Sequence, residues 1–195
     1  NQRGLSVLNT LVKKKISIEH IFLSKKNLNQ IVFKKICKQK IPFSKVTNIN
    51  SKKVELIIKK NKPDLNIVAG FPYIIEKKIY NIPKYGTINL HAGKLPEYRG
   101  GSPLNWQIIN NEKKIGISII KLTQKLDAGE IVSSKKFDLK NNYDIKRVHE
   151  LSNKYFGLLT INAIQKILKK KKFKKQDIKK VKYWRQRKEL DGFLD

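Results

Sequence analysis

Apolar residues recur along this chain with two different spacings, and segments with one spacing alternate with segments of the other. A spacing near 3.6 residues predicts amphipathic helices, whereas short and nearly continuous apolar runs predict strands. The predicted helices cover residues 4–14, 28–38, a segment that starts after 51, residues 103–110, and a long segment that ends near 170. The predicted strands cover residues 18–23, 41–47, 65–69, 86–90, 115–122 and 130–139. Strands that alternate with helices predict an α/β fold with a doubly wound, mostly parallel sheet and helices on both faces.

Capping signals mark the starts of three predicted helices. Ser51 precedes the third helix, Ser102 stands before Pro103 at the start of the fourth, and Asn142 or Asp144 precedes the long one. Oxygens of Ser, Asn and Asp side chains accept hydrogen bonds from the first turn of a helix, and Pro is tolerated there. We therefore expect helices to begin at these residues.

The start of the sequence lacks one expected element. An α/β domain normally begins with a strand, and in a doubly wound sheet that strand is commonly central. This sequence instead begins at Asn1 with a segment that leads into a helix, and it contains no Met. We therefore expect that the first strand is missing. Residues 1–172 would form an N-terminally truncated catalytic domain, and residues 173–195 a basic C-terminal segment or the start of a linker.

The charge of the chain leaves two interpretations open. The net charge of +29 comes from 44 basic residues, of which only five are Arg and 39 are Lys, against 15 acidic residues. Nucleic-acid surfaces usually rely on the forked donors of Arg, whereas these Lys residues are spread over almost every segment. A solvated, Lys-rich surface is the simpler interpretation, and a surface for polyanions or nucleotide-linked substrates is the alternative.

Cysteine content and hydropathy exclude several classes of protein. Cys37 alone cannot form an internal disulfide, which suits a reducing cytoplasm, and its place in a helical pattern predicts a small buried residue. No apolar run approaches the ~20 residues that span a bilayer, and the sequence does not begin with a secretory signal. We expect a cytoplasmic protein without a membrane partner, and the sequence does not indicate its oligomeric state.

Residues suited to acyl transfer lie where predicted strands end. Asn89 and His91 are two residues apart, so in a strand both side chains point to the same side. Asp127 lies in a turn between the last two predicted strands. Ligands of open α/β sheets bind at the carboxyl ends of the strands. There, a carboxamide and an imidazole can stabilise an oxygen that gains negative charge, and a carboxylate can orient the imidazole or accept an amine proton. The pattern favours acyl transfer to an amine through a tetrahedral intermediate.

Each of these residues also has a plain structural explanation. A His at a strand end is often a satisfied structural group, and Asp before Ala–Gly is an ordinary turn former. His20 and His149 are assigned to packing or to the surface. The sequence shows no metal-ligand cluster, no serine nucleophile elbow and no phosphate-binding glycine loop. Spacing alone therefore leaves both a catalytic and a structural role open.

A resemblance to a known family favours catalysis. The segment GTINLHAGKLPEYRGGSPLNWQIINNEKKIGISIIKLTQKLDAGEIV resembles the signature region of the folate-dependent formyltransferases, with Asn-x-His, then Leu-Pro-x-Tyr-Arg-Gly, then Asp-x-Gly. The similarity covers most of residues 50–140, and the ending YWRQRKELDG is similar to the segment that leaves this domain in longer members. The resemblance implies a Rossmann-like domain that uses 10-formyltetrahydrofolate as formyl donor, with Asn89, His91 and Asp127 as catalytic residues.

The resemblance also implies residues that hold the donor. These cofactor-binding positions are Gly70, Phe71, Pro72, Tyr73, Leu95, Pro96, Thr123, Leu126 and Gly129. Tyr98, Arg99 and Gly100 follow the family motif as residues that bind substrate or brace a loop. Ala92 and Gly93 depart from the Pro-Ser of many members, which would affect the acceptor side.

The resemblance also favours one acceptor. Leu104, Asn105 and Trp106 are similar to enzymes that act on nucleotide-linked amino sugars, so we expect such a small-molecule acceptor. Initiator methionyl-tRNA is the alternative, although methionyl-tRNA formyltransferases more often carry Ile-Gln at this place. A formyl-folate hydrolase and a non-catalytic, basic nucleic-acid-binding module are more distant alternatives.

Overall fold

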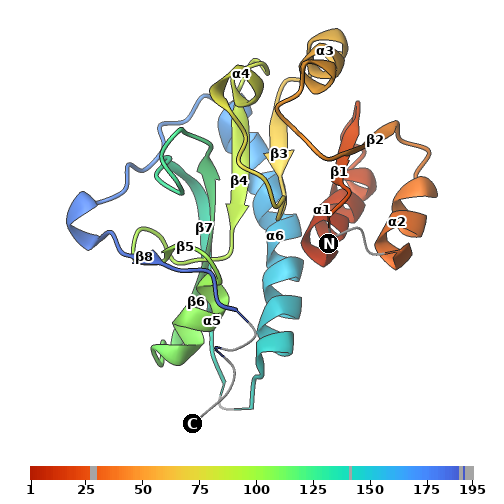
Figure 1. Cartoon of the computed structure of the whole chain (residues 1–195). Helices are drawn as coiled ribbons and strands as arrows, with labels where there is room; N and C mark the ends of the chain where they lie inside the picture. Colours follow the sequence, from red (N-terminus) through yellow and green to blue (C-terminus); the bar gives the residue numbers. More distant parts are fainter. Residues whose placement is uncertain (27–29, 141, 189–190, 192–195) are drawn as a thin grey trace.

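The computed structural model describes residues 1–26, 30–140, 142–188 and 191 of the chain. Its main sheet has the strand order β3 (Asn66–Val68), β4 (Thr87–His91), β6 (Lys114–Lys121) and β7 (Ile131–Asp138) (Figure 1). Strands β3 and β4 are parallel, whereas β6 runs antiparallel to both β4 and β7. Two smaller parallel sheets pair β1 (Ile21–Ser24) with β2 (Phe43–Val46) and β5 (Arg99–Gly100) with β8 (Tyr183–Trp184).

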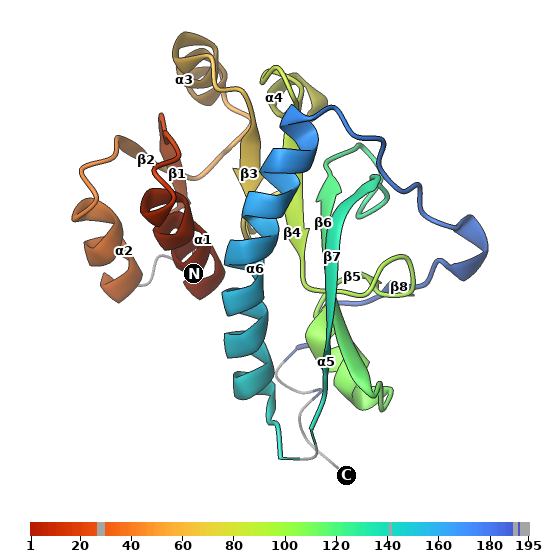
Figure 2. The same cartoon turned by 180° about the vertical axis from the view of Figure 1, so that it is seen from behind.

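Helices α5 (Pro103–Ile109) and α6 (Ile145–Leu168) contact the main sheet. Helix α6 runs along the main sheet and packs against β6, β7 and helix α1 (Gln2–Lys13), as Figure 2 shows from behind. Helix α5 contacts both β6 and α6. The remaining elements are α2 (Gln30–Cys37), α3 (Lys52–Asn61), α4 (Lys77–Tyr80) and a 3-10 turn (Ile178–Lys180). The predicted α/β alternation is confirmed.

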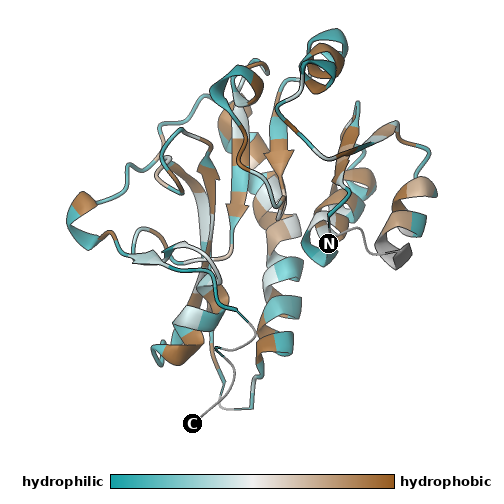
Figure 3. Cartoon of the chain, in the orientation of Figure 1, coloured by the Kyte–Doolittle hydropathy of each residue, from teal (hydrophilic) through white to brown (hydrophobic). Residues whose placement is uncertain are grey.

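The main core lies between the sheet and α6. All of residues 115–120 in β6 are buried, which explains why this strand reads as an almost continuous apolar run. Phe156 and Ala163 of α6 are fully buried against it. In Figure 3 the strands of the main sheet carry much of the hydrophobic colour, and the exposed helix faces are mostly hydrophilic. The strand that carries Asn89 and His91 is therefore a rigid support.

Two of the three capping predictions are confirmed. The Ser51 hydroxyl accepts a hydrogen bond from the Val54 N–H at 3.4 Å, and the Asp144 carboxylate accepts one from the Arg147 N–H at 2.7 Å. Ser102 precedes α5 as expected, but the prediction that its side chain caps the helix is wrong. Its backbone is left-handed, with φ of 45°, and its hydroxyl instead accepts hydrogen bonds from the C-terminal segment at residues 186 and 187.

The prediction that Cys37 is buried is also wrong. Cys37 is exposed, and its neighbour Ile36 packs into a core cluster, with only 4% of its surface exposed. Helix α2 ends at Cys37, so the buried face finishes one residue earlier than the sequence pattern indicates. Residues 28 and 29 of the predicted helix lie outside the described residues.

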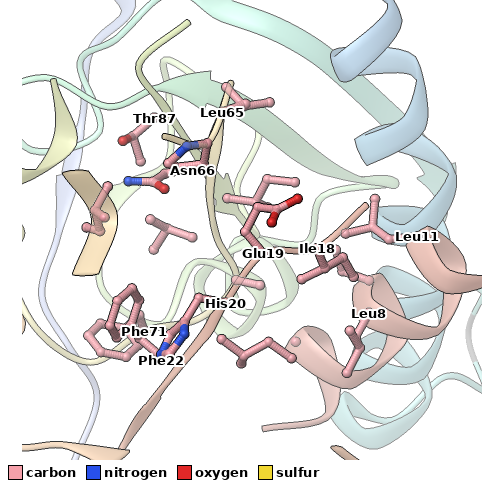
Figure 4. Close-up of a pocket in the computed structure, with 18 of the residues that line it drawn as sticks. Leu8, Leu11, Ile18, Glu19, His20, Phe22, Leu65, Asn66, Phe71 and Thr87 are labelled. Atoms are coloured by element: carbon pink, nitrogen blue, oxygen red, sulfur yellow. The ribbon is translucent and has the colours of Figure 1, made fainter. Parts of the chain in front are cut away.

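A cavity lies between the β1–β2 sheet and the main sheet. In the described part of the chain, β1 and β2 form their own sheet and do not pair with β3. A cavity of about 680 Å³ lies between β1 and β3, with Leu8, Leu11 and Ile18 from one side and Leu65 and Asn66 from the other (Figure 4).

Candidate active site

Strand β4 presents two polar side chains on one side. Asn89 pairs with Ile120 and His91 with Ser118 across the antiparallel ladder to β6. Because side chains alternate along a strand, Asn89 and His91 point the same way, and Leu90 between them points into the core with 1% of its surface exposed. The imidazole of His91 is itself only 6% exposed. The sequence spacing correctly predicted this arrangement.

The loop between β6 and β7 brings a carboxylate to these two residues. Oδ2 of Asp127 lies 3.4 Å from Nδ1 of His91, and Oδ1 lies 3.5 Å from the amide nitrogen of Asn89. The backbone N–H of Gly100 donates a hydrogen bond to Oδ2 at 3.0 Å. The structure thus brings together the three residues that the sequence singled out. Asp127 adopts a left-handed backbone with φ of 47°, which aims its side chain back at β4.

The contacts of His91 define which ring nitrogen can exchange a proton. Its Nε2 lies 2.6 Å from the carbonyl oxygen of Tyr98, and because a carbonyl oxygen can only accept, Nε2 carries a hydrogen. Nδ1 is therefore the nitrogen that gains or loses a proton, and it faces Asp127. Gly93 makes the Tyr98 contact possible, since a Cβ at this residue would lie 2.5 Å from both Nε2 and the Tyr98 oxygen.

Opposing effects act on the pKa of His91. Burial lowers this pKa and is the largest cause, the Asp127 carboxylate and the Tyr98 carbonyl raise it, and the nearby Arg3 and Arg99 lower it. The net direction is downward, so the ring is neutral at pH 7, with a free lone pair on Nδ1. A proton that arrives at Nδ1 is then held between the imidazole and the carboxylate.

Asn89 keeps hydrogen-bonding capacity for a ligand. Its contact with Asp127 is long, at 3.5 Å, and within the described residues its side chain makes no other hydrogen bond. A carboxamide has two N–H donors and an acceptor oxygen. One donor of Asn89 can therefore point to an oxygen outside the protein.

The predicted donor-binding residues lie on three segments of the chain, within residues 70–73, 95–96 and 123–129. Gly70, Phe71 and Pro72 line the large cavity beside β3, whereas Asn89, His91 and Asp127 are not among its lining residues. Leu95 and Pro96 are buried in the segment between β4 and β5. Tyr73 packs its ring edge-on against Phe71, with 5.5 Å between the centroids.

The loop over residues 123–129 is exposed at its tip and constrained at its end. Thr123 is exposed, and Leu126 leaves 59% of its surface exposed next to the buried carboxylate of Asp127. At Gly129 an added Cβ would lie 1.7 Å from the carbonyl oxygen of Lys121. Only glycine allows this close approach, which returns the chain to β7 immediately after Asp127.

Sequence reasoning missed the part of the site that comes from the C-terminal segment. Gln176 donates hydrogen bonds to the carbonyl oxygens of Asp127 and Gly129 at 2.8 and 2.7 Å, and it accepts from Arg99. The phenol of Tyr183 accepts a further hydrogen bond from Arg99 at 3.0 Å. Tyr98, Arg99 and Gly100 all brace this region, and Tyr98 stacks on Trp184 with 5.6 Å between ring centroids. A glutamine in a Lys-rich stretch gives no sequence signal for such contacts.

Metal sites and membrane-spanning helices are two further features that bear on function. Among the residues that the structure describes, no three His, Cys, Asp or Glu side chains gather as metal ligands. No helix in the same part of the chain is long and apolar enough to cross a membrane.

The fold and the site together define an α/β domain with a buried Asn–His–Asp cluster where a central strand meets a loop. Within that class, the chain belongs to the formyl transferase family, which matches residues 12–156. It is 34% identical over 147 residues to a methionyl-tRNA formyltransferase from a Sulfurihydrogenibium species, an alignment that covers 75% of this chain and 47% of the relative. It is also 34% identical over 197 residues to the bifunctional polymyxin resistance protein ArnA of Wigglesworthia glossinidia brevipalpis, with 98% and 30% covered.

Solved structures agree on the fold. The formyltransferase PseJ from Anoxybacillus kamchatkensis, in complex with UDP-4,6-dideoxy-4-formamido-L-AltNAc and tetrahydrofolate, superposes with a TM-score of 0.62 at 22% identity. That match covers 85% of each chain. These comparisons confirm the predicted family and the Rossmann-like fold. The chain spans less than half the length of the two curated relatives described above.

Proposed function

We propose that this chain transfers a formyl group from 10-formyltetrahydrofolate to a primary amine, and that the amine belongs to an amino sugar on a nucleotide carrier. The observation that carries the proposal is the convergence of Asn89, His91 and Asp127, with the carboxylate 3.4 Å from the imidazole and 3.5 Å from the carboxamide. Family membership makes formyl transfer the natural chemistry for this cluster.

Each residue of the cluster has a role that its contacts support. Acyl transfer to an amine places negative charge on the acyl oxygen and requires the amine to lose a proton. The free donor of Asn89 suits the acyl oxygen. Because Nε2 of His91 is held by Tyr98, His91 acts through Nδ1, whose lone pair faces Asp127 and can take up a proton. Asp127 then stabilises the imidazolium that forms when the amine is deprotonated, directly or through water.

The loops around the cluster fit a folate donor. A pteridine needs apolar walls together with backbone donors and acceptors. Leu126, which is 59% exposed, offers an apolar surface beside Asp127, and Leu95 is a further apolar residue of the predicted donor-binding set. Phe71 and Tyr73 add aromatic surface on the loop after β3. We assign these residues, with Gly70, Pro72, Pro96, Thr123 and Gly129, to the donor side.

An aromatic and cationic surface supports a nucleotide-linked acceptor. The guanidinium groups of Arg185 and Arg187 lie 5.8 and 5.6 Å from the ring of Trp106. Trp106 contacts Trp184 at a centroid distance of 4.9 Å, and Trp184 pairs with Gly100, whose N–H binds Asp127. This surface is therefore connected to the cluster, and it combines a stacking ring with positive charge for a base and phosphates. Arg185 is currently paired with Asp191.

Initiator methionyl-tRNA is a second candidate acceptor. The observation in its favour is the 34% identity to a methionyl-tRNA formyltransferase, together with a net charge of +29 that suits a polyanion. One relative that aligns with 98% of this chain, including its C-terminal segment, does not carry the name of a methionyl-tRNA formyltransferase but that of the bifunctional polymyxin resistance protein ArnA. The Leu104–Asn105–Trp106 resemblance and the Trp106 surface favour the sugar.

A product screen tests the proposal. The protein is incubated with 10-formyltetrahydrofolate and either a panel of nucleotide-linked amino sugars or initiator methionyl-tRNA, and the formylated product is detected by mass spectrometry. We expect an N-formylated sugar nucleotide, and its loss in the His91→Ala variant. Formylated tRNA alone would move the assignment to the second candidate. Formate release without any amine would identify a hydrolase, and salt-sensitive RNA binding without folate binding would refute the enzyme assignment.

A further inference from the structure

Gln176 links two loops of the candidate site through every polar atom of its side chain. Its Nε2 donates to the carbonyl oxygens of Asp127 and Gly129, at 2.8 and 2.7 Å. Its Oε1 accepts from Nε and Nη2 of Arg99, at 3.0 and 2.9 Å. A carboxamide has two N–H donors and one oxygen with two lone pairs, so this side chain is fully used by the two loops.

The segment that carries Gln176 is fixed on both sides of it. Before Gln176, Lys174 exchanges backbone hydrogen bonds with Ile131 at the start of β7, at 2.8 and 3.3 Å. After it, β8 pairs with β5, and the indole of Trp184 donates to the Glu97 carbonyl at 2.9 Å. Figure 1 shows this C-terminal segment leaving α6 and returning to lie along β5. These contacts on both sides fix the segment, and Gln176 is therefore held against the loop over residues 123–129.

The loop it holds is fixed at Asp127 by contacts from two sides. Asp127 has a backbone φ of 47°, in the left-handed region, which Asp adopts more readily than most non-glycine residues. Gln176 fixes the carbonyl of Asp127 while Gly100 fixes its carboxylate. Arg99 is 7% exposed, and within the described residues its guanidinium contacts Gln176 and Tyr183 but no carboxylate.

We propose that Gln176 is a positioning residue, which holds the loop over residues 123–129 so that the carboxylate of Asp127 faces Nδ1 of His91. Its role in turnover rests on the proposed function, whereas its effect on geometry does not. A misplacement of about 1 Å at a reacting group is enough to reduce turnover roughly 100-fold.

Two variants and a matched control separate positioning from general stability. Gln176→Glu still accepts hydrogen bonds from Arg99, but a carboxylate cannot donate to the carbonyls of Asp127 and Gly129, so only the loop contact is broken. Gln176→Leu removes both contacts. Gln165→Glu makes the same chemical change at an exposed residue of α6.

Turnover is measured with the acceptor found in the product screen, and the titration of the three His rings is followed by NMR. We expect Gln176→Glu to lower kcat roughly 100-fold, with KM for the donor changed less than about threefold, and Gln165→Glu to match the wild type. The charged groups that act on His91 are Asp127, Arg3 and Arg99, and Asp127 raises its pKa. Displacing that carboxylate should lower the pKa of His91 further and leave His20 unchanged.

The outcomes distinguish the two proposals. A lowered pKa of His91 in Gln176→Glu supports positioning, because the negative charge added beside Arg99 would by itself raise this pKa. This holds even if the wild type formylates no acceptor, in which case the proposed function fails alone. Wild-type turnover and an unchanged His91 titration in Gln176→Glu would overturn the inference and leave the proposed function standing. If Gln176→Leu unfolds, Gln176→Glu still provides the test, because its Arg99 contacts remain.

Discussion

Replacing Asp127 with Asn removes one negative charge from the candidate site while keeping the size of the side chain. Oδ2 of Asp127 makes two contacts, accepting from the Gly100 N–H at 3.0 Å and facing Nδ1 of His91 at 3.4 Å. In the variant the carboxamide oxygen keeps this position, because an amide there would oppose the Gly100 N–H donor to donor. A neutral oxygen attracts the imidazolium less than a carboxylate does, so Asp127→Asn should disfavour proton uptake at Nδ1 without disturbing the fold.

The distance between the two groups gives the magnitude. At the 3.4 Å separation, opposite unit charges attract by roughly 5 kcal/mol at the effective dielectric constant of about 20 that describes protein sites. Each ~1.4 kcal/mol of lost transition-state stabilisation lowers a rate tenfold. The variant should therefore lose about 10³- to 10⁴-fold in kcat, which lies within the ~10²–10⁴ that general acid–base groups contribute.

Single-turnover formyl transfer measures this loss directly, with donor binding followed separately by calorimetry. We expect donor affinity within about threefold of the wild type and a thermal midpoint lowered by no more than a few degrees. Turnover within tenfold of the wild type would refute the role given to the His91–Asp127 pair. A change in donor affinity alone, with kcat retained, would refute it equally and would place Asp127 in binding.

Three further predictions concern stability and loop geometry. Burial lowers the pKa of His91, so the imidazole binds a proton less readily in the native state than in the unfolded chain. The free energy of unfolding should therefore be at its highest above about pH 6.5 and should decline as the pH falls below that value. Urea midpoints between about pH 5 and 7.5 check this, and an equally steep decline in His91→Gln would contradict it. Gln107 is fully buried and binds both the N–H and the carbonyl of Gly116, so Gln107→Ala should cost about 2–4 kcal/mol, and a loss below about 1 kcal/mol in denaturant unfolding would be inconsistent. In Gly129→Ala the new Cβ would lie 1.7 Å from the Lys121 oxygen, so the loop must move and kcat should fall roughly 100-fold; retained kcat would show that the loop position is unimportant.

The local pattern of apolar and polar residues predicts most of the helices and strands, and within the candidate site it predicts the placement of Asn89 and His91. The side-chain period of two in an extended strand is sufficient to place Asn89 and His91 on one side. Ser51 and Asp144 were identified as helix caps because capping depends on residues only three apart along the chain. The burial of Cys37 and the capping role of Ser102 were predicted wrongly, because the end of a short helix and a left-handed turn depend on what packs beside them.

By itself, the sequence determined the alternation of strands and helices and the family resemblance, since both depend on local order and on motifs that are continuous in the chain. The tertiary structure decided how the site is closed. Asp127 reaches Asn89 across 38 residues and Gln176 reaches Asp127 across 49, contacts that no local period encodes. The structure also decided which nitrogen of His91 can titrate, because the Tyr98 carbonyl that occupies Nε2 is placed by a turn at Gly93 that only folding creates.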